Sequence, residues 1–323
     1  MILIKFPKSN NIKFYAAYFV LCIFIPALLL EFSLRLVTFP SGTGGGSASQ
    51  RWFAENWKPL NTDGYRDLDF DVNSKKPAMV FLGDSFTAGH GVKFTETYYF
   101  WARKNFSISY DFVNLGRNGA STKHEEKNLA KFFSAHNVQP RYVIHQYFGN
   151  DIEDYIERVT VERGFLRRNF SRVSELYNFI DTYFYIAEFS KKYMDQLLGA
   201  YENHNLFEQH FSDIKRIHEL VYSKNGQIIF IVFPFLNSEK ALNASGTHIK
   251  KVKDSFLQSC RQGDIFIDVT PLAFSLNSSE RVVNFMDGHP SPRLHRMVGE
   301  RLSEIFSYAN SLAAKDGVTY CTK

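Results

Sequence analysis

The stretch Ala78-Met79-Val80-Phe81-Leu82-Gly83-Asp84-Ser85-Phe86-Thr87 decides the fold of this chain. It begins as a short apolar run, which is typical of a buried strand, and it ends in a glycine-containing turn that cannot continue the strand. Open α/β sheets bind their ligands at the carboxyl ends of the strands. The sequence therefore predicts a serine, Ser85, held at the carboxyl edge of a sheet.

Apolar runs of strand length alternate with helical patterns along the rest of the chain. We expect strands at 78–82, 112–115, 142–147, 227–233 and 265–269. We expect helices at 97–105, 122–136, 206–223, 247–260 and 292–310. This alternation predicts a parallel sheet covered on both faces, which is an α/β, flavodoxin-like three-layer sandwich.

Three further segments place polar residues after probable strands or in loops. Asn114-Leu115-Gly116-Arg117-Asn118-Gly119 follows the second strand, and Gly149-Asn150-Asp151 follows the third. Asp287-Gly288-His289-Pro290 precedes the last helical pattern. A parallel sheet could bring such segments together, because the carboxyl ends of its strands meet at one edge.

A serine, a glycine, an asparagine and a histidine thus occur in one order, and the chain resembles the SGNH subgroup of the GDSL hydrolases from about 61 to about 306. The resemblance implies the SGNH hydrolase fold and an ester hydrolase activity. It implies that Ser85 is the nucleophile, His289 the general base and Asp287 its orienting acid. It also implies an oxyanion hole formed by the backbone N–H groups of Ser85 and Gly119 and by the side chain of Asn150.

The spacing of the last segment departs from the usual pattern of the family. The family usually has Asp-x-x-His, whereas this chain has Asp287-x-His289, and Met286 stands three residues before the histidine. Methionine cannot orient an imidazole. Membrane-anchored relatives are similar to this chain in the shorter spacing, so we assign Asp287 as the acid.

The residue types also fit acyl chemistry by themselves. A serine hydroxyl needs a base to remove its proton, and the pKa of histidine suits that task at neutral pH. A carboxylate on the other ring nitrogen fixes the tautomer and stabilises the imidazolium. Preorganised donors stabilise the oxyanion by about 3–4 kcal/mol each. A glycine donor lets the backbone approach the substrate closely, because it has no Cβ.

Each assignment has a structural alternative. Ser85 could be an ordinary turn serine, and Gly116 could be the donor in place of Gly119. Asn150 could cap a helix, and Asp287 could begin a turn.

Other polar residues near these segments receive structural roles. We assign Asp84 to hydrogen bonding within the turn that holds Ser85. Five histidines lack the spacing of metal ligands, so we expect them at surface or core positions: His90, His145, His204, His210 and His295. We expect no metal and no other cofactor.

The amino-terminal part of the chain predicts a membrane-spanning helix. Residues 14–30 contain no charge, and apolar character continues to Val37. At about 1.5 Å per residue, a helix over 14–37 exceeds the roughly 30 Å of hydrocarbon in a bilayer. Glu31 and Arg35 lie one turn apart and can pair.

The flanking charges predict the orientation of this helix. Lys5, Lys8 and Lys13 lie in the segment 1–13, which is therefore expected in the cytoplasm, with the rest of the chain outside. A cleaved signal peptide is an alternative, since Ser47-Ala48-Ser49 offers small residues, and a buried core helix is another.

Composition divides the remaining chain. Residues 38–60 form a Gly/Ser-rich linker, in which 41–49 is expected to be a flexible tether. The hydrolase-like domain covers 61–310, and 311–323 is a carboxy-terminal tail. Within 61–67 the chain resembles a short arm of membrane-anchored relatives, which would lie against the domain near the site or form a plain surface turn.

An aromatic-rich helical insertion, 152–205, follows Asn150 directly. It could form a cap that shapes an acyl or sugar pocket, although aromatic residues at helical spacing more often pack a core. Cys260 and Cys321 would face an oxidising compartment, where they could pair. The net charge of +5 is diluted over a large surface and gives no case for nucleic acid as a partner.

These features favour a single-pass membrane protein whose periplasmic or other extracytoplasmic domain hydrolyses an acyl ester through a Ser85 acyl-enzyme. The expected substrate is an acylated small molecule or glycan, by analogy with anchored relatives that act on acetylated surface glycans. One alternative is an O-acyltransferase with a sugar hydroxyl as acceptor. Another is a catalytically silent glycan-binding or assembly protein. Protein partners cannot be read from the sequence.

Overall fold

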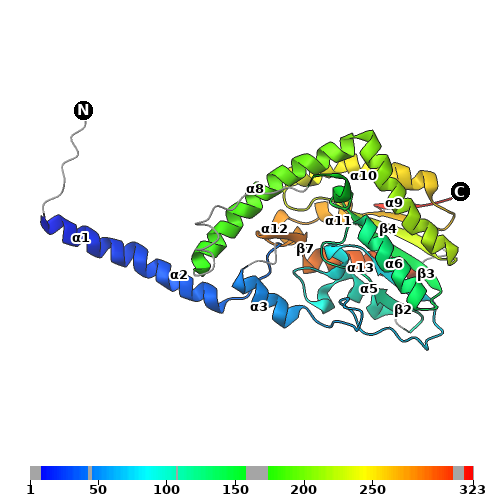
Figure 1. Ribbon diagram of the computed structural model, residues 1–323, viewed down its shortest axis with the longest axis horizontal. Helices are drawn as coiled ribbons and strands as arrows, with labels where there is room; N and C mark the ends of the chain where they lie inside the picture. The colour runs from blue at the N-terminus through cyan, green and yellow to red at the C-terminus, as the bar shows by residue number, and fades with distance from the viewer. Residues whose placement is uncertain (1–8, 43–45, 107, 158–173, 308–315, 323) are drawn as a thin grey trace.

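The computed structural model describes residues 9–42, 46–106, 108–157, 174–307 and 316–322 (Figure 1). A long apolar helix at the amino terminus extends away from an α/β domain. The expected carboxy-terminal part of the last helix, 308–310, lies outside the described residues.

Six strands form one sheet in the order β2-β1-β3-β4-β5-β8. Their bounds are β1 Ala78–Leu82, β2 Asp111–Asn114, β3 Pro140–Phe148, β4 Gln227–Phe233, β5 Ile265–Asp268 and β8 Val318–Tyr320. The first five strands are parallel, which confirms the predicted sheet, and β8 pairs antiparallel with β5. The segment expected to be a tail thus adds an edge strand to the sheet.

β1 and β4 after Gln227 are continuous apolar runs because both faces of the sheet are buried. In β1, Met79 and Phe81 pack into one core cluster, whereas Val80 and Leu82 pack into the other. Successive residues of a strand point to opposite faces, so one apolar run supplies both cores.

Helices cover the two faces and form the expected three layers. One face packs against α5 (Tyr98–Phe106) and α13 (Pro292–Ser307), and the other against α6 (Thr122–Ala135), α9 (His204–Ser223) and the greater part of α10 (Glu239–Ser259). All five predicted helices are present. The helix expected from 247 begins earlier, because Ser238 caps it by accepting the backbone N–H of Ala241.

Several short elements connect these layers. They are α4 (Ser85–Ala88), η2 (Phe94–Glu96), η3 (Asp151–Tyr155), α11 (Thr270–Phe274) and α12 (Ser278–Arg281). A separate antiparallel hairpin consists of β6 (Val282–Asn284) and β7 (Asp287–Pro290). This hairpin was not predicted from the sequence, and it carries two of the predicted site residues.

The amino-terminal helix consists of α1 (Ser9–Phe19), a π-helical turn (Val20–Phe24) and α2 (Ile25–Leu36). Its segment Ile12–Leu36 is long and apolar enough to cross a membrane, with a mean hydropathy of 2.2, and its most apolar stretch is not buried in the rest of the protein. The expected helix over 14–37 therefore forms, with its last helical residue at Leu36.

The charged residues of this helix serve its attachment to the domain. Arg35 Nη2 lies 2.7 Å from Glu31 Oε1, as the spacing predicts. The same Glu31 carboxylate accepts the backbone N–H groups of Glu175 and Leu176 at 3.0 and 2.8 Å. These residues begin α8 (Glu175–Glu202), and a carboxylate at a helix N-terminus is favourable.

The expectation of a flexible tether over 41–49 is wrong for the part that the structure describes. Ser41 and Ser49 are buried, and α3 (Ser47–Asn56) lies within the expected linker. Arg51 on α3 donates to the backbone carbonyls of Leu34 and Val37 at 3.1 and 2.8 Å. Small residues give the segment its linker-like composition, but they also let the backbone pack closely against the domain.

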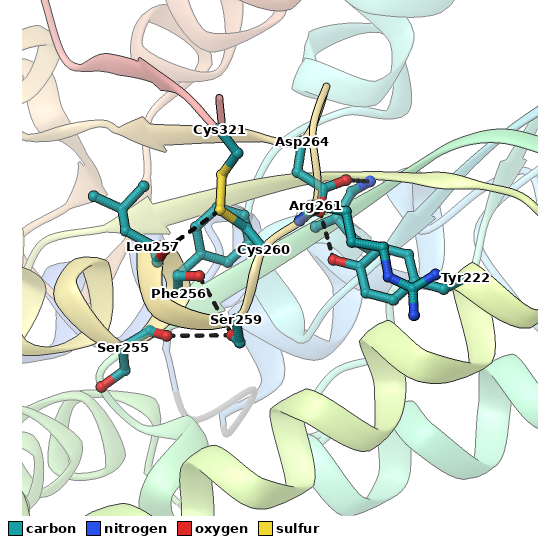
Figure 2. The surroundings of a disulfide bond; sticks show 10 residues. Tyr222, Ser255, Phe256, Leu257, Ser259, Cys260, Arg261, Asp264 and Cys321 are labelled. Carbon is teal, nitrogen blue, oxygen red and sulfur yellow. Dashed lines mark hydrogen bonds between the residues drawn. A yellow bond between two sulfur atoms is a disulfide. The ribbon is translucent and has the colours of Figure 1, made fainter. Parts of the chain in front are cut away.

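A disulfide bond between Cys260 and Cys321 fastens the carboxy terminus to the end of α10 (Figure 2). Asp264 organises the loop between α10 and β5, since its carboxylate accepts the backbone N–H groups of Ile228 and Arg261, each at 2.8 Å. The backbone N–H of Cys321 donates to the carbonyl of Asp264 at 2.9 Å. The pairing that the sequence left open is therefore present.

Removing this disulfide should lower the unfolding temperature of the protein. The bond closes a loop with a sequence separation of 61 residues, and such cross-links typically contribute about 2–4 kcal/mol to the free energy of unfolding. We expect a reductant to lower the midpoint of thermal unfolding of the detergent-solubilised protein, and Cys260→Ser/Cys321→Ser to show that low midpoint with or without reductant. A Cys22→Ser variant is the control. Equal midpoints for all proteins would contradict the structural role of the bond.

Candidate active site

Ser85 lies directly after β1, at the first position of the one-turn helix α4. Asp84 caps this helix, because its Oδ1 accepts the backbone N–H of Phe86 at 2.8 Å. A Cβ at Gly83 would lie 2.2 Å from Thr87 Oγ1, so only glycine fits there. Close packing thus requires Gly83, the cap of α4 requires Asp84, and Ser85 occupies the first helical position. The hydrogen-bonding role expected for Asp84 is confirmed.

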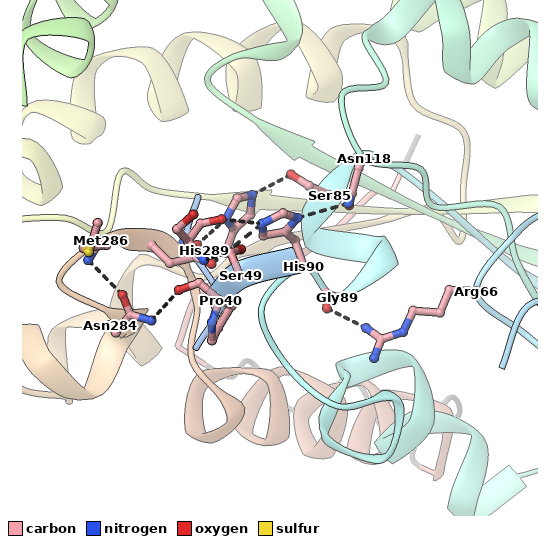
Figure 3. A network of polar contacts seen from close by, with 12 residues as sticks. Pro40, Ser49, Arg66, Ser85, Gly89, His90, Asn118, Asn284, Met286 and His289 are labelled. Carbon is pink, nitrogen blue, oxygen red and sulfur yellow. Dashed lines mark hydrogen bonds and ion pairs between the residues drawn. The ribbon is translucent and has the colours of Figure 1, made fainter. Parts of the chain in front are cut away.

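The structure brings Ser85, His289 and Asp287 into one line of hydrogen bonds, and Figure 3 shows the serine and the histidine of this line. Ser85 Oγ lies 2.9 Å from His289 Nε2, and His289 Nδ1 lies 2.5 Å from Asp287 Oδ1. Since Asp287 is ionised beside Nδ1–H, the unprotonated Nε2 faces the serine hydroxyl. Ser85 is only 8% exposed.

The strand β7 explains why the short Asp-x-His spacing works. Residues two apart in a strand point to the same face, so Asp287 and His289 lie side by side. Asp287 Oδ1 also accepts the backbone N–H of His289 at 3.1 Å, which holds the carboxylate toward the imidazole. A pair three residues apart would not share a face of a regular strand.

The electrostatics of the pair favour a basic imidazole. Burial opposes the charge on Asp287, but the neighbouring His289 lowers the pKa of Asp287 below its ordinary value. Burial likewise opposes protonation of His289, yet the charge and the hydrogen bond of Asp287 raise the pKa of His289 above its ordinary value. The carboxylate therefore makes Nε2 a better proton acceptor.

The two glycines of the second segment have different surroundings. The N–H of Gly116 donates to Asn114 Oδ1 at 2.8 Å, and a Cβ there would lie 2.5 Å from the backbone nitrogen of Ala88. Gly116 thus packs against the nucleophile turn with its N–H engaged. Gly119 has a φ of +69°, and no atom lies within 4 Å of where its Cβ would be. Of the two, Gly119 has the open surroundings that a substrate needs.

Asn150 follows β3 and precedes η3. Its side chain makes no capping hydrogen bond to that helix, so the capping alternative does not describe it. Burial raises the pKa of Asp84 while the Asn150 side chain opposes that rise, which indicates that Asn150 lies close to the nucleophile turn. Its Oδ1 is buried without a hydrogen-bond partner among the described residues.

Buried carboxyl groups lie behind the nucleophile turn. Burial raises the pKa of Asp84 to about 6, and burial also raises the pKa values of Glu125 and Asp151 well above their ordinary range. His145 Nε2 lies 3.0 Å from Glu125 Oε2, and its Nδ1 lies 3.2 Å from His218 Nε2. Protonation of Glu125 and Asp151 limits negative charge near the position where an oxyanion would form.

The arm expected within 61–67 lies against the nucleophile turn, so the alternative of a plain surface turn is wrong. Arg66 is buried, and its guanidinium donates to the backbone carbonyls of Gly89 and Val92 at 2.6 and 2.8 Å. The adjacent Asp67 accepts the backbone N–H of Asn114 at 2.8 Å. The arm therefore connects the loop after α4 with the second segment.

His90 lies beside the predicted triad and not at an unrelated position. Its ring centroid is 4.2 Å from that of His289, and its Nε2 is 3.7 Å from Asp287 Oδ2. The other four histidines match their expected surface or core positions: His204 is exposed, and His145, His210 and His295 are buried. Only the flanking glycines in Gly89-His90-Gly91 could have indicated that His90 sits in the nucleophile loop.

His90, Asp287 and His289 are also the one group of three metal-ligand side chains that the described part of the chain brings together, with their ligand atoms within 4.8 Å of one another. His289 is hydrogen-bonded through both ring nitrogens, to Ser85 and to Asp287. Both ring nitrogens of His90 also have hydrogen-bond partners. These hydrogen bonds make Asp287 and His289 members of the predicted triad, and His90 is a histidine beside it.

The aromatic-rich insertion divides into two parts, and its residues 158–173 lie outside the described chain. Near the start of α8, Phe179 contacts Phe39 and Phe285 at ring distances of 6.0 and 6.1 Å. Toward the end of α8, Tyr193 and Tyr201 pack with the core on one face of the sheet. The described insertion therefore serves as core at one end and faces the β6–β7 turn at the other.

No curated protein matches the chain. Similar solved structures include a lipolytic G-D-S-L family member from Veillonella parvula, with 14% identity and a TM-score of 0.45 over 72% of this chain and 98% of that chain. A lipase/acylhydrolase from Enterococcus faecalis has 15% identity and a TM-score of 0.41 over 72% and 96%. A carbohydrate acetylesterase family member from Sinorhizobium meliloti has 13% identity and a TM-score of 0.41 over 71% and 97%.

The model of the GDSL-like lipase/acylhydrolase family matches residues 81–297, which is more than half of the 323 residues. This range includes the nucleophile turn, the second and third segments and the β6–β7 hairpin. The chain therefore belongs to the GDSL-like lipase/acylhydrolase family.

Proposed function

We propose that this protein is a serine ester hydrolase in which Ser85 is the nucleophile, His289 the general base and Asp287 the acid that orients it. The observation that carries this proposal is the unbroken line of hydrogen bonds from Ser85 Oγ through both nitrogens of His289 to Asp287. Such a line is what nucleophilic acyl transfer requires. It also argues against a catalytically silent binding protein.

In the proposed reaction, His289 Nε2 takes the proton of Ser85 Oγ as that oxygen attacks the ester carbonyl carbon. The oxyanion accepts hydrogen bonds from the backbone N–H groups of Ser85 and Gly119 and from the side chain of Asn150. His289 then gives its proton to the leaving alcohol, and an acyl-enzyme remains on Ser85. Water attacks the acyl carbon with the same base, which releases the acid and restores the serine.

We propose that the amino-terminal helix is a membrane anchor and that the domain lies outside the cytoplasm. Lys5, Lys8 and Lys13 before the helix support this orientation. The Cys260–Cys321 disulfide supports it independently, because such bonds persist in oxidising compartments. An extracytoplasmic esterase would meet the acylated, in particular acetylated, glycans of the cell surface, which we propose as its substrate class.

Loss of the nucleophile or of the base should abolish turnover. We expect a fluorophosphonate probe to label Ser85 in the detergent-solubilised full chain, and Ser85→Ala to remove both the labelling and the hydrolysis of short-chain aryl esters. Each of Ser85→Ala and His289→Ala should lower kcat by up to about a million-fold. Ser134→Ala, an exposed helical serine, is the matched control. Labelling of another serine, with activity retained in Ser85→Ala, would contradict the assignment.

The pH dependence should report the pair of His289 and Asp287. His289 acts as a base only when neutral, so kcat/KM should fall as the pH falls through the pKa of His289, which lies above the ordinary value of 6.5. In Asp287→Asn this acid limb should move to lower pH, because Asp287 raises that pKa, and kcat should fall by up to about 10⁴-fold. An unchanged limb with wild-type kcat would show that Asp287 does not orient the base.

An O-acyltransferase is the second candidate. The observation that favours it is the contact between Tyr183 of α8 and Phe285 in the turn before Asp287, with ring centroids 6.2 Å apart. Phe285 is 70% exposed, so these rings offer a surface on which a sugar acceptor could stack close to the triad acid. A bound acceptor competes with water through its effective concentration.

The two activities differ in the fate of the acyl group. We expect free acid to be the main product when an acyl donor is supplied, with or without surface oligosaccharides, because the proposed function is hydrolysis. Mass spectrometry of the free acid and of the acylated sugar measures both products, and Ser85→Ala is the blank. Acylated sugar as the main product at saturating acceptor would instead identify a transferase.

A further inference from the structure

The segment Pro40–Gly42, which we call the juxtamembrane strap, holds the turn of the hairpin that carries the triad acid. Asn284 Nδ2 donates to the carbonyl of Pro40 at 2.9 Å, and the N–H of Gly42 donates to the carbonyl of Met286 at 3.0 Å. These two bonds fix both ends of the turn between β6 and β7. The chain that leaves the apolar helix therefore holds the turn that precedes the triad acid.

His90 lies between the strap and the triad (Figure 3). Its Nε2 is 3.2 Å from the carbonyl oxygen of Ser41, and its ring packs against the ring of His289. Phe53 of α3 also contacts His90, with ring centroids 4.7 Å apart. His90 thus contacts the strap, α3 and the triad at once.

The hydrogen bonds of His90 define its protonation. A carbonyl oxygen can only accept, so Nε2 must carry a hydrogen to bond Ser41. The side-chain Nδ2 of Asn118, 3.0 Å from Nδ1, can only donate, so Nδ1 must be unprotonated. His90 is therefore a neutral imidazole whose N–H is directed toward the strap and lies near Asp287.

The second carboxylate oxygen of Asp287, Oδ2, needs a polar group beside it. Asp287 Oδ2 is buried and has no hydrogen-bond partner among the described residues. Gly91 packs directly against this oxygen, because a Cβ there would lie 2.7 Å from it. His90 Nε2 lies 3.7 Å from this oxygen, so its N–H, which donates to Ser41, is a polar group beside the carboxylate and not a hydrogen-bond donor to it. Buried carboxylate oxygens without such a dipole are costly.

We propose that His90, held by the juxtamembrane strap, is a positioning residue for Asp287, so that the attachment of the apolar helix helps to build the triad. This inference rests on the proposed function. His90 and the strap do not touch the reacting atoms of the ester. They act through Asp287, by fixing the turn before it and by presenting a neutral dipole to its second oxygen.

Neutrality is essential to this role. The titratable groups that face His90 are Asp287 and His289, and His289 becomes positively charged during the reaction. A second cation against that ring would oppose the proton transfer. Burial and the neighbouring His289 lower the pKa of His90 to about 4, so His90 stays neutral where the triad works.

The strap is itself held in place from the side of the apolar helix. The N–H of Ser41 donates to Ser49 Oγ of α3 at 3.1 Å. Two residues further along α3, Arg51 binds the backbone carbonyls of Leu34 and Val37 at the end of α2. The contacts thus run without interruption from the end of the apolar helix through α3 and the strap to His90.

Variants of the full chain in detergent test this inference, with turnover expressed per Ser85 that reacts with the fluorophosphonate probe. His90→Phe keeps the ring and loses the N–H, so we expect kcat to fall about 10- to 100-fold with KM nearly unchanged, and the acid limb of the pH profile to move to lower pH. His90→Gln retains a neutral N–H donor and should restore most of both. Ser49→Ala removes the hydrogen bond between the strap and α3 and should cause a smaller shift in the same direction.

His248→Phe is the matched control, since His248 is also buried and neither of its ring nitrogens has a hydrogen-bond partner among the described residues. A loss of stability alone would lower the number of labelled sites but would leave the acid limb in place. Wild-type turnover per labelled site and an unchanged limb in His90→Phe, or in Ser49→Ala if His90→Phe does not fold, would overturn the inference. A wild-type chain that does not react with the probe at Ser85 would instead overturn the proposed function.

Discussion

The hydrogen bond between Ser85 Oγ and His289 Nε2 joins residues that are 204 positions apart in the chain. Neither partner can reach the other unless the sheet is complete, because Ser85 follows its second strand from the edge and His289 lies on a hairpin that follows the last parallel strand. The apolar faces of the sheet supply the stability that this placement requires. The candidate active site is thus a consequence of burying largely apolar strands between two layers of helices.

Carboxyl groups that are costly to bury lie behind the nucleophile turn of the candidate site. Asp84, Glu125 and Asp151 lie in the interior, and burial raises the pKa of each. Asp84 is nevertheless needed, because it caps α4 and so fixes the direction of Ser85. Carboxyl groups that remain protonated can take part in hydrogen bonding without a buried charge. Burying these carboxyl groups therefore lowers stability, whereas the cap of α4 by Asp84 holds Ser85 in a fixed orientation.

Residues that precede β1 in the chain also hold parts of the candidate site in place. Arg66 holds the loop after α4, Arg51 holds the end of the apolar helix, and the strap holds the turn before Asp287. Guanidinium groups suit such positions, since their donors can satisfy several backbone carbonyls at once. The segments before β1 are consequently part of the α/β domain and not only its connection to the apolar helix.

The sequence by itself determined the parallel sheet, the nucleophile turn and the apolar amino-terminal helix. These features depend on local patterns: strands such as β1 are apolar throughout, and Gly83 and Ser85 lie where that run stops. The Asp287 and His289 pair was predictable as chemistry, but only the strand β7 shows why a two-residue spacing brings them together.

Only the tertiary structure decided the hairpin, the edge strand β8, the ordered strap and the position of His90. β6 and β8 have three residues each, which is too short for a periodic signal, and they form through pairing with residues distant in sequence. Glycine and serine in the strap predict flexibility locally, whereas their packing against Met286 depends on contacts more than 200 residues away. Local composition determines the local conformational propensity of a segment, and contacts distant in sequence determine its position in the folded protein.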